Sequence, residues 1–275
     1  KLLEELSQAC GNNRPLQVAR ELTKVYEESI GNDIQSVLSG KTSLISIYNK
    51  TKIDLITIMP ILENLGVHVY DELTTKIKND SQTFGYIHSF RISIDDKAID
   101  CVNHQKEIVD LFAAVFDNYT ENDPLNGLII NTPLNWRSVN VLQTYRNLYL
   151  QLEAPFSKEK VNNVLLNNKD CACTLFKWFE TKFSLEPDYG KIEYRKKVLI
   201  PKIKQQFQDQ LREVQAVSDD IILRSLGNLI DHTLRTNFFM PKAIHETAIS
   251  IKIDSQNVSQ MPEPAPYREI YVHDV

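Results

Sequence analysis

Residues 84–94, "FGYIHSFRISI", alternate between large apolar or aromatic side chains and smaller or polar ones. Successive side chains of a strand point to opposite faces, so this stretch predicts a β-strand with one face in a hydrophobic core. The core face carries Phe84, Tyr86, His88, Phe90, Ile92 and Ile94. The next segment is expected to cover that face with an amphipathic helix, whose apolar stripe is formed by Ile108, Phe112, Val115, Phe116 and Tyr119.

The segments before this strand extend the pattern toward the N-terminus. "TSLISIYNK" (42–50) predicts a strand, "DLITIMPILENLG" (54–66) a helix and "VHVYDELTTKI" (67–77) a second strand. Asp54 is expected to cap the helix, and Gly66 to supply the left-handed residue that ends it. Strand, helix, strand, strand, helix is the order of a split βαβ, ferredoxin-like unit.

The second half of the chain is predicted to be mainly helical. Leu142, Tyr145 and Tyr149 form one helical stripe, and Ser157 is placed to cap the helix that follows. A long helical run is expected from about residue 193 to 239, interrupted near Pro201 and again at Ser218, which is expected to act as a cap. Two strands, "AISIKID" (248–254) and "REIYVHD" (268–274), close the chain. The predicted fold class is therefore α+β.

Composition excludes several classes of function. A chain of 275 residues with 42% hydrophobic and 24% charged residues is typical of a soluble globular protein, and no apolar run approaches the ~20 residues that span a bilayer. A net charge of −5 argues against a broad nucleic-acid surface. The cysteines are too few and too unevenly spaced for a disulfide framework and fit a reducing cytosol; they are Cys10, Cys101, Cys171 and Cys173.

Known catalytic and cofactor motifs do not occur in the sequence. The eight glycines are too far apart for a dinucleotide-binding or phosphate-binding loop. "HETAI" at His245 lacks the second histidine of a zinc-protease motif, and His68 and His88 alternate with apolar residues as structural histidines do. Nothing assembles a nucleophile, base and orienting group, so we predict no catalytic, cofactor-binding or metal-binding residues within this segment.

Four stretches nevertheless resemble one family: "IMPILENLGVHVYDE" (58–72), "TENDPLNGLIINTPLNWRSVNVLQTYRNLYLQ" (120–151), "LRSLGNLIDHTLRTNFF" (223–239) and "IDSQNVSQMPEPAPYREIYVHD" (253–274). They are similar, in order and spacing, to consecutive segments of the very large bacterial NAD-specific glutamate dehydrogenases. The resemblance spans residues 53–275. Its most specific residues are expected to make family-specific or interdomain contacts; they are Asn122, Asp123, Trp136, Arg137, Arg235, Asn237, Arg268 and Glu269.

The resemblance implies a domain organisation and a role. It implies a helical N-terminal arm (1–40), an ACT-like domain (41–130), a helical domain (131–240) and the first strands of a catalytic domain (241–275), with the substrate and NAD sites beyond residue 275. Ligand-binding ACT domains commonly have a glycine at the turn into the first helix, whereas this turn, "KTKID" (50–54), has none. The implied partners are the catalytic domain, further copies of the chain and an amino-acid effector, in a cytoplasmic enzyme.

Two alternative functions remain open from the sequence. One is a stand-alone amino-acid sensor, which would bind an amino acid saturably. The other is an architectural interaction module, which would self-associate without responding to small molecules. If the resemblance to glutamate dehydrogenases holds, Arg235 and Arg268 are expected to make polar contacts between the helical region and the catalytic domain, although surface salt bridges would explain both side chains equally well.

Overall fold

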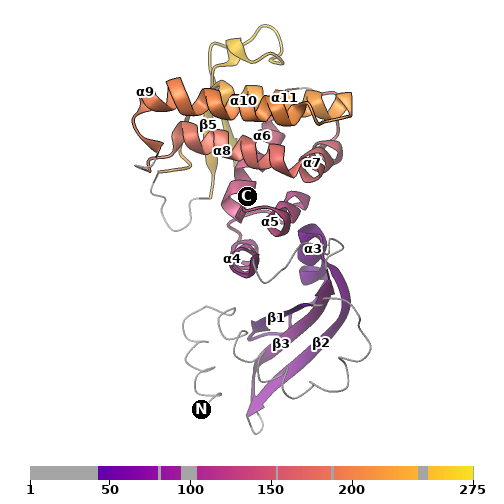
Figure 1. Ribbon diagram of the computed structural model, residues 1–275. Coiled ribbons are helices and arrows are strands. Elements are labelled where there is room, and N and C mark those ends of the chain that lie inside the picture. The colour runs from indigo at the N-terminus through magenta and orange to yellow at the C-terminus, as the bar shows by residue number, and fades with distance from the viewer. Residues whose placement is uncertain are drawn as a thin grey trace. The chain divides into compact units, whose positions relative to one another are not determined.

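The computed structural model describes residues 43–79, 82–93, 104–152, 154–186, 189–240 and 247–274 (Figure 1). The chain divides into two compact units, one ending at Ala113 and the other beginning at Ala114. The predicted N-terminal arm over residues 1–40 lies outside the described residues. Among the helices that are described, none is long and apolar enough to cross a bilayer.

The first unit contains the predicted βαββα order. Its elements are β1 (Ser43–Asn49), α3 (Leu55–Leu65), β2 (His68–Asn79), β3 (Gln82–Ser93) and most of α4 (Gln105–Phe116), whose last residues, from Ala114 on, belong to the second unit. The sheet has the order β1-β3-β2, and both neighbouring pairs are antiparallel. The two strands on either side of α3 in the sequence are therefore separated by β3 in the sheet, which is the split βαβ arrangement. The α+β, ACT-like prediction is confirmed.

The core of this unit follows the predicted pattern. His88, Phe90 and Ile92 of β3 are buried and Tyr86 is half-buried, while the Phe84 side chain and Ile94 lie outside the description. Gly66 has φ 80° and its N–H bonds back to the carbonyls of Glu63 and Leu62, so it ends α3 as predicted. Asp54 occupies the N-cap position, but its side chain makes no capping hydrogen bond, so that detail of the prediction is wrong.

The second unit packs helices around an aromatic and aliphatic core. A 3₁₀ turn (Pro124–Gly127) leads into α5 (Leu128–Asn131), and α6 (Trp136–Gln151), α7 (Lys158–Asn167) and α8 (Lys169–Phe183) follow. A short α9 (Ile192–Tyr194) and a π-helical turn (Arg195–Leu199) precede α10 (Ile200–Leu211) and α11 (Val217–Asp231). The fully buried side chains include Leu142, Tyr145, Tyr149, Leu165, Phe179, Ile222 and Leu229.

Capping and close packing explain parts of this arrangement. The Ser157 side chain accepts from the Lys160 N–H, which confirms the predicted cap of α7. The predicted cap at Ser218 is wrong, because α11 begins at Val217 with Ala216 at its N-cap position. Gly227 allows α11 to approach its neighbours closely, since a Cβ atom there would lie 3.0 Å from the Phe207 ring.

A second three-stranded sheet, with the order β4-β5-β6, belongs to the same unit. Its strands are β4 (Thr233–Thr236), β5 (Ile249–Ile253) and β6 (Glu269–His273), and both pairs are antiparallel. The long helix predicted to reach residue 239 instead ends at Asp231. The backbone of β4 pairs with β5, which is distant in sequence, and this tertiary pairing decides the conformation of the β-branched Thr233 and Thr236.

Candidate functional site

A buried ion pair lies at the centre of the second unit. Asp123 is 2% exposed and Arg146 of α6 is 0% exposed. The Arg146 Nη1 donates to Asp123 Oδ1 at 2.7 Å and to Asn162 Oδ1 of α7 at 2.8 Å. Asp123 also caps the Pro124–Gly127 turn by accepting from the Leu125 N–H. One guanidinium therefore joins α6, α7 and the segment that precedes α5.

Asp123 remains ionised in this pair in spite of its burial. Burial alone would raise the pKa of Asp123, but the hydrogen bond and charge of Arg146 outweigh it, with help from the Leu125 N–H and the Lys158 ammonium. The pKa of Asp123 is consequently held below its ordinary value. Lys158 lies 3.4 Å from Asp123 Oδ2 and is itself half-exposed. A carboxylate held in this way is a structural anion, not a proton donor at neutral pH.

The network continues from Arg146 to the last strand. The Arg146 Nε donates to Asn147 Oδ1 at 3.0 Å, which leaves the Asn147 amide nitrogen to donate to His273 Nδ1 at 3.4 Å. The His273 Nε2 in turn donates to Asn140 Oδ1 at 3.2 Å. His273 is the last residue of β6 and is 5% exposed. A continuous path of side-chain hydrogen bonds thus runs from Asp123 through α6 to β6.

His273 is held as a neutral imidazole. Burial lowers its pKa, and nearby Arg146 acts in the same direction, although the carboxylates of Glu121, Asp123 and Asp274 oppose them. Protonation would place a hydrogen on Nδ1 facing the Asn147 amide group, which already donates there. The geometry and the pKa shift therefore agree that a charged His273 does not fit this site.

The sequence-predicted residues near α6 occupy different environments. Asp123 belongs to the buried network, and Asn122 beside it is half-buried. Trp136 is the first residue of α6, and the Arg137 guanidinium lies over its ring at 5.2 Å from the centroid. Arg137 is exposed and forms no ion pair with any residue in the described parts of the chain.

The other four predicted residues lie in or beside the second sheet. Asn237 fastens the end of β4 to β5, because its Oδ1 accepts from the Ser250 N–H at 2.8 Å and its amide donates to the Ala248 carbonyl. Arg268 donates to Asp254 at 2.5 Å and stacks on Tyr267, and Glu269 begins β6. Arg235 is exposed and pairs in register with Lys252.

Sequence reasoning missed Arg146, His273 and the asparagines that join them. Polar residues of α6 lie between the predicted apolar positions and resemble a solvated helix face. In the structure α6 is covered on nearly all sides, so that Asn140, Gln143, Thr144 and Arg146 are buried as well. The position of Arg146 beside Tyr145 and Tyr149 could have indicated a buried guanidinium. A guanidinium among aromatic side chains requires a partner for its charge.

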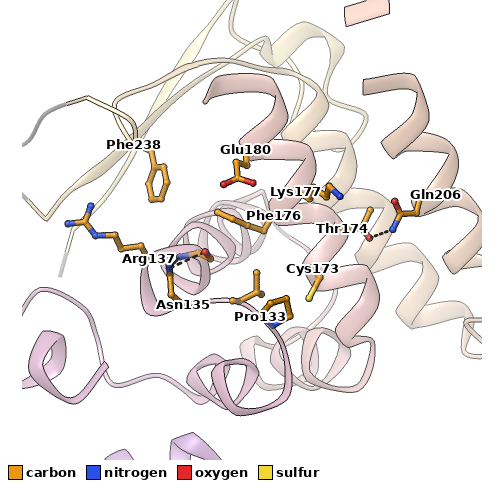
Figure 2. A pocket seen from close by; sticks show the side chains of 12 residues that line it. Pro133, Asn135, Arg137, Cys173, Thr174, Phe176, Lys177, Glu180, Gln206 and Phe238 are labelled. Atoms are coloured by element: carbon orange, nitrogen blue, oxygen red, sulfur yellow. Dashed lines mark hydrogen bonds between the residues drawn. The ribbon is translucent and has the colours of Figure 1, made fainter. Parts of the chain in front are cut away.

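A surface pocket of about 580 Å³ opens beside the start of α6. Its walls come from the segment Pro133–Ser138, from α8, from Gln206 of α10 and from Phe238 (Figure 2). One face of α8 lines the pocket with Cys173, Phe176, Lys177 and Glu180. Phe176 and Lys177 lie three and four residues after Cys173 and four and three before Glu180, which is the spacing of one helix face. Arg137 of the predicted set lines the same pocket.

Metal-binding and reactive-thiol chemistry have little support in the described regions. No group of three or more His, Cys, Asp or Glu side chains among those residues could hold a metal ion. Cys171 is buried, and burial together with nearby Asp170 raises the pKa of its thiol to about 11. A thiol with so high a pKa is protonated at neutral pH and is a poor nucleophile.

The first unit holds its own buried polar cluster at His88. The Ile53 N–H, in the turn before α3, donates to His88 Nε2 at 3.2 Å. The other ring nitrogen, Nδ1, lies 3.0 Å from Thr74 Oγ1 and 3.2 Å from Glu72 Oε1. His88 is 0% exposed, and both of its ring nitrogens lie within hydrogen-bonding distance of other groups of the protein. The backbone donor of Ile53 is thereby occupied by a side chain of the protein itself.

Family models match the chain in three consecutive parts. Residues 38–105 match the ACT3 domain of glutamate dehydrogenase, residues 120–185 match its helical motif 3, and residues 206–275 match the catalytic domain of bacterial NAD-glutamate dehydrogenase. The third match begins within α10, so it includes α11 and all of the second sheet. The chain is therefore similar, in this order, to an ACT domain, a helical motif and part of a catalytic domain of glutamate dehydrogenases.

The curated relatives that the chain matches all carry the name NAD-specific glutamate dehydrogenase. The NAD-specific glutamate dehydrogenase of Pseudomonas aeruginosa is 30% identical over 226 residues, that of Halomonas elongata 27% over 225, and that of Mycobacterium tuberculosis 24% over 235. These alignments cover 81%, 80% and 78% of this chain, but only 14%, 13% and 14% of the respective relatives. The predicted resemblance of this chain to bacterial NAD-specific glutamate dehydrogenases is confirmed.

Proposed function

We propose that this chain is a non-catalytic segment of a large NAD-dependent glutamate dehydrogenase, which joins an ACT-like domain and a helical region to the first part of the catalytic domain. The whole enzyme would convert L-glutamate, NAD and water into 2-oxoglutarate, ammonia and NADH. NAD is assigned to the rest of that enzyme, because the glycines of this chain are too widely spaced for a dinucleotide-binding loop.

The observation that carries this proposal is the hydrogen-bonded path from Asp123 to His273. Asp123, Asn140, Arg146 and Asn147 lie in the part that matches the helical motif, and His273 lies in the part that matches the catalytic domain. The Nη1 and Nε atoms of Arg146 and both ring nitrogens of His273 are hydrogen-bonded, and buried hydrogen bonds of this kind fix the relative orientation of the elements that carry them. A displacement of β6 would therefore shift the side chains of α6, and a displacement of α6 would shift β6.

The outer face of the second sheet supports a further contact surface. Ile270 and Val272 of β6 are 67% and 55% exposed, and Arg235 pairs with Lys252 in the same sheet. Like charges directly opposite each other in a sheet are destabilising unless a partner compensates them. We assign this face, with Arg235, to contact with the remainder of the catalytic domain, and Arg268 to a local brace on Asp254.

We further propose that the segment contributes to regulation and to homo-oligomerisation of a cytoplasmic enzyme. The Ile53 N–H is engaged by His88, which favours a scaffold role for the turn before α3 over direct amino-acid binding there. The alternative function is a stand-alone amino-acid sensor or architectural module. Partners of this role are the enzyme's own catalytic domain, further copies of the chain and an amino-acid effector, with no nucleic acid or membrane.

The proposal is tested by assaying the 275-residue chain for glutamate-dependent NADH formation and by thermal unfolding with NAD. We expect no turnover, and no change in the unfolding midpoint with NAD. A ligand at about 100 times its Kd adds roughly 2.7 kcal/mol to the free energy of unfolding, so NAD binding would be readily seen. Turnover by this chain alone, or stabilisation by NAD, would contradict the assignment of catalysis to the rest of the enzyme.

A further inference from the structure

The pocket beside α6 combines the groups that recognise a small zwitterion. Its volume of about 580 Å³ lies within the range of roughly 300–1,000 Å³ that is typical of small-molecule sites. Its lining includes two cations, Arg137 and Lys177, one carboxylate, Glu180, and the aromatic rings of Phe176 and Phe238. The polar groups come from two different helices, α6 and α8, and the rings from α8 and the segment after β4.

An anionic group is favoured at the α6 end of the pocket. The first backbone N–H groups of a helix have no partner within the helix, and its N-terminus carries a partial positive charge. The Asn135 side chain accepts from the N–H and the hydroxyl of Ser138. Within the described residues no hydrogen bond engages the N–H groups of Trp136 and Arg137, so both can serve an external acceptor. Arg137 adds a full positive charge at the same place and has no carboxylate partner in the part of the chain that is described. A ligand carboxylate would receive backbone and guanidinium hydrogen bonds together.

A cationic group is favoured at Glu180. Its Oε2 accepts from the Tyr189 hydroxyl at 2.5 Å. A carboxylate has about four acceptor positions, so one hydrogen bond leaves capacity for an ammonium group. Figure 2 shows the Glu180 carboxylate directed toward the region of the pocket that contains Phe176 and Phe238.

The aromatic residues supply a rigid apolar surface in the same pocket. Phe238 contacts Phe179 edge-on with centroids 5.5 Å apart, and Phe176 lies 6.4 Å from the same ring. Phe179 is fully buried, so both pocket rings are supported from beneath by the core. An apolar or aromatic ligand side chain would gain both burial and ring contact there.

We propose that this pocket binds a free amino acid with an apolar or aromatic side chain, its carboxylate at the α6 N-terminus and Arg137, its ammonium at Glu180 and its side chain against Phe176 and Phe238. The occupant would connect the region that matches the helical motif with Phe238 in the region that matches the catalytic domain. The regulatory meaning of such binding rests on the proposed function, whereas the binding itself does not.

Titration calorimetry of the 275-residue chain tests this site with L-phenylalanine as the probe. We expect saturable binding with one site, and about tenfold weaker binding of 3-phenylpropanoate, which lacks the amine, and of 2-phenylethylamine, which lacks the carboxylate. Arg137→Gln and Glu180→Gln should each weaken L-phenylalanine binding by about tenfold or more. Absence of saturable binding would overturn the proposal, and a failure to oxidise glutamate has no bearing on this test.

Two matched variants separate the proposed contacts from general damage. Tyr189→Phe removes the hydroxyl that bonds to Glu180 but keeps the carboxylate, so binding should persist. Arg212→Gln changes an exposed arginine outside the pocket lining and should leave binding unchanged. Thermal unfolding of each variant checks that it folds, and hydrogen exchange should slow at residues 236–240 when L-phenylalanine binds. Equal binding by the wild type, Arg137→Gln and Glu180→Gln would place the ligand elsewhere and overturn the assignment.

Discussion

Each of the two sheets buries one histidine, and the two side chains have different kinds of partner. His88 of β3 bonds to side chains of the adjacent strand β2 and to the Ile53 N–H in the turn between β1 and α3. His273 of β6 bonds to Asn140 and Asn147 of α6, which precede it by 133 and 126 residues. The first histidine therefore closes its own βαβ unit, whereas the second fastens a strand to a helix that is distant in sequence.

The hydrogen positions on the two rings are opposite. The Nε2 of His88 accepts from a backbone N–H, so its Nδ1 carries the hydrogen. The Nε2 of His273 donates to an asparagine oxygen and its Nδ1 accepts. In both sites the neighbouring groups fix the ring by using both of its nitrogens. A buried histidine can therefore stabilise either a local turn or a contact between elements that are distant in sequence, and its hydrogen-bond partners reveal which.

The largest expected loss of stability comes from breaking the hydrogen-bonded network that connects Asp123 to His273. Arg146→Ala should lower the free energy of unfolding by about 3–5 kcal/mol, because it leaves the Asp123 carboxylate buried without its partner. Urea denaturation followed by circular dichroism measures this loss. The control Arg212→Ala removes an exposed pair with Asp209 and should cost under about 1 kcal/mol. Similar losses for the two variants would show that burial of the Arg146 pair does not matter.

The local histidine should have a smaller effect. His88→Ala leaves the Ile53 N–H and Glu72 without their buried partner, so we expect a loss of about 1–3 kcal/mol. Hydrogen exchange of the Ile53 amide should accelerate, because its acceptor is gone. Lys50→Ala, an exposed change in the same turn, is the control and should leave that exchange rate unchanged. An unchanged Ile53 rate in His88→Ala would remove the local role assigned to His88.

The pH dependence of stability should reveal the contribution of His273. The pKa of His273 is lowered in the folded state, so the unfolded state binds the proton more readily and stability falls as the pH drops below the ordinary histidine pKa of about 6.5. The contribution of this one group has a slope of at most about 1.4 kcal/mol per pH unit. Urea unfolding at about pH 7.5 and about pH 5.5 should show a smaller loss of stability on acidification for His273→Gln than for the wild type.

The same measurements at the two pH values can also contradict the role assigned to His273. If the wild type and His273→Gln lose equal stability on acidification, His273 is not held neutral by its partners on α6. The Asp123 carboxylate does not disturb this comparison, because its lowered pKa keeps it charged at both pH values.

The smallest predicted effect concerns the turn that ends α3. Gly66→Ala should cost about 1 kcal/mol, because φ is 80° and an alanine side chain is strained in that region. No atom lies within 4 Å of an added Cβ, so the cost comes from the backbone alone. Thermal unfolding measures this cost, and Glu63→Ala, an exposed change in the same helix, is the control. A neutral Gly66→Ala would contradict the assigned helix end.

Local patterns predicted the first unit well. The alternation in β3, the helical spacing of α3 and the glycine at its end are short-range signals, and the structure follows them. The pattern of β6 was more ambiguous, since its two faces carry different side chains and either could be buried. Tyr271 and His273 turn inward, whereas Ile270 and Val272 are exposed, because the inward face is the one that meets α6.

The long-range features could not be read from the sequence in the same way. The pairing of β4 with β5 overrides the helical continuation expected after Asp231, and no local signal specifies that partner strand. The polar residues of α6 resemble a solvated face until the elements that cover them are known. Asp123 was predicted through the family resemblance, whereas its partner Arg146 was not predicted and is identified by the geometry.

A double-mutant cycle tests directly whether His273 attaches β6 to α6. The free energy of unfolding is measured for the wild type, Asn140→Ala, His273→Ala and the double variant. We predict a coupling energy of about 0.5–3 kcal/mol, as for residues in one hydrogen-bonded network, and additivity within roughly 0.5 kcal/mol when Arg212→Ala replaces Asn140→Ala. Additive effects of Asn140→Ala and His273→Ala would contradict the claim that these side chains join the helix to the strand.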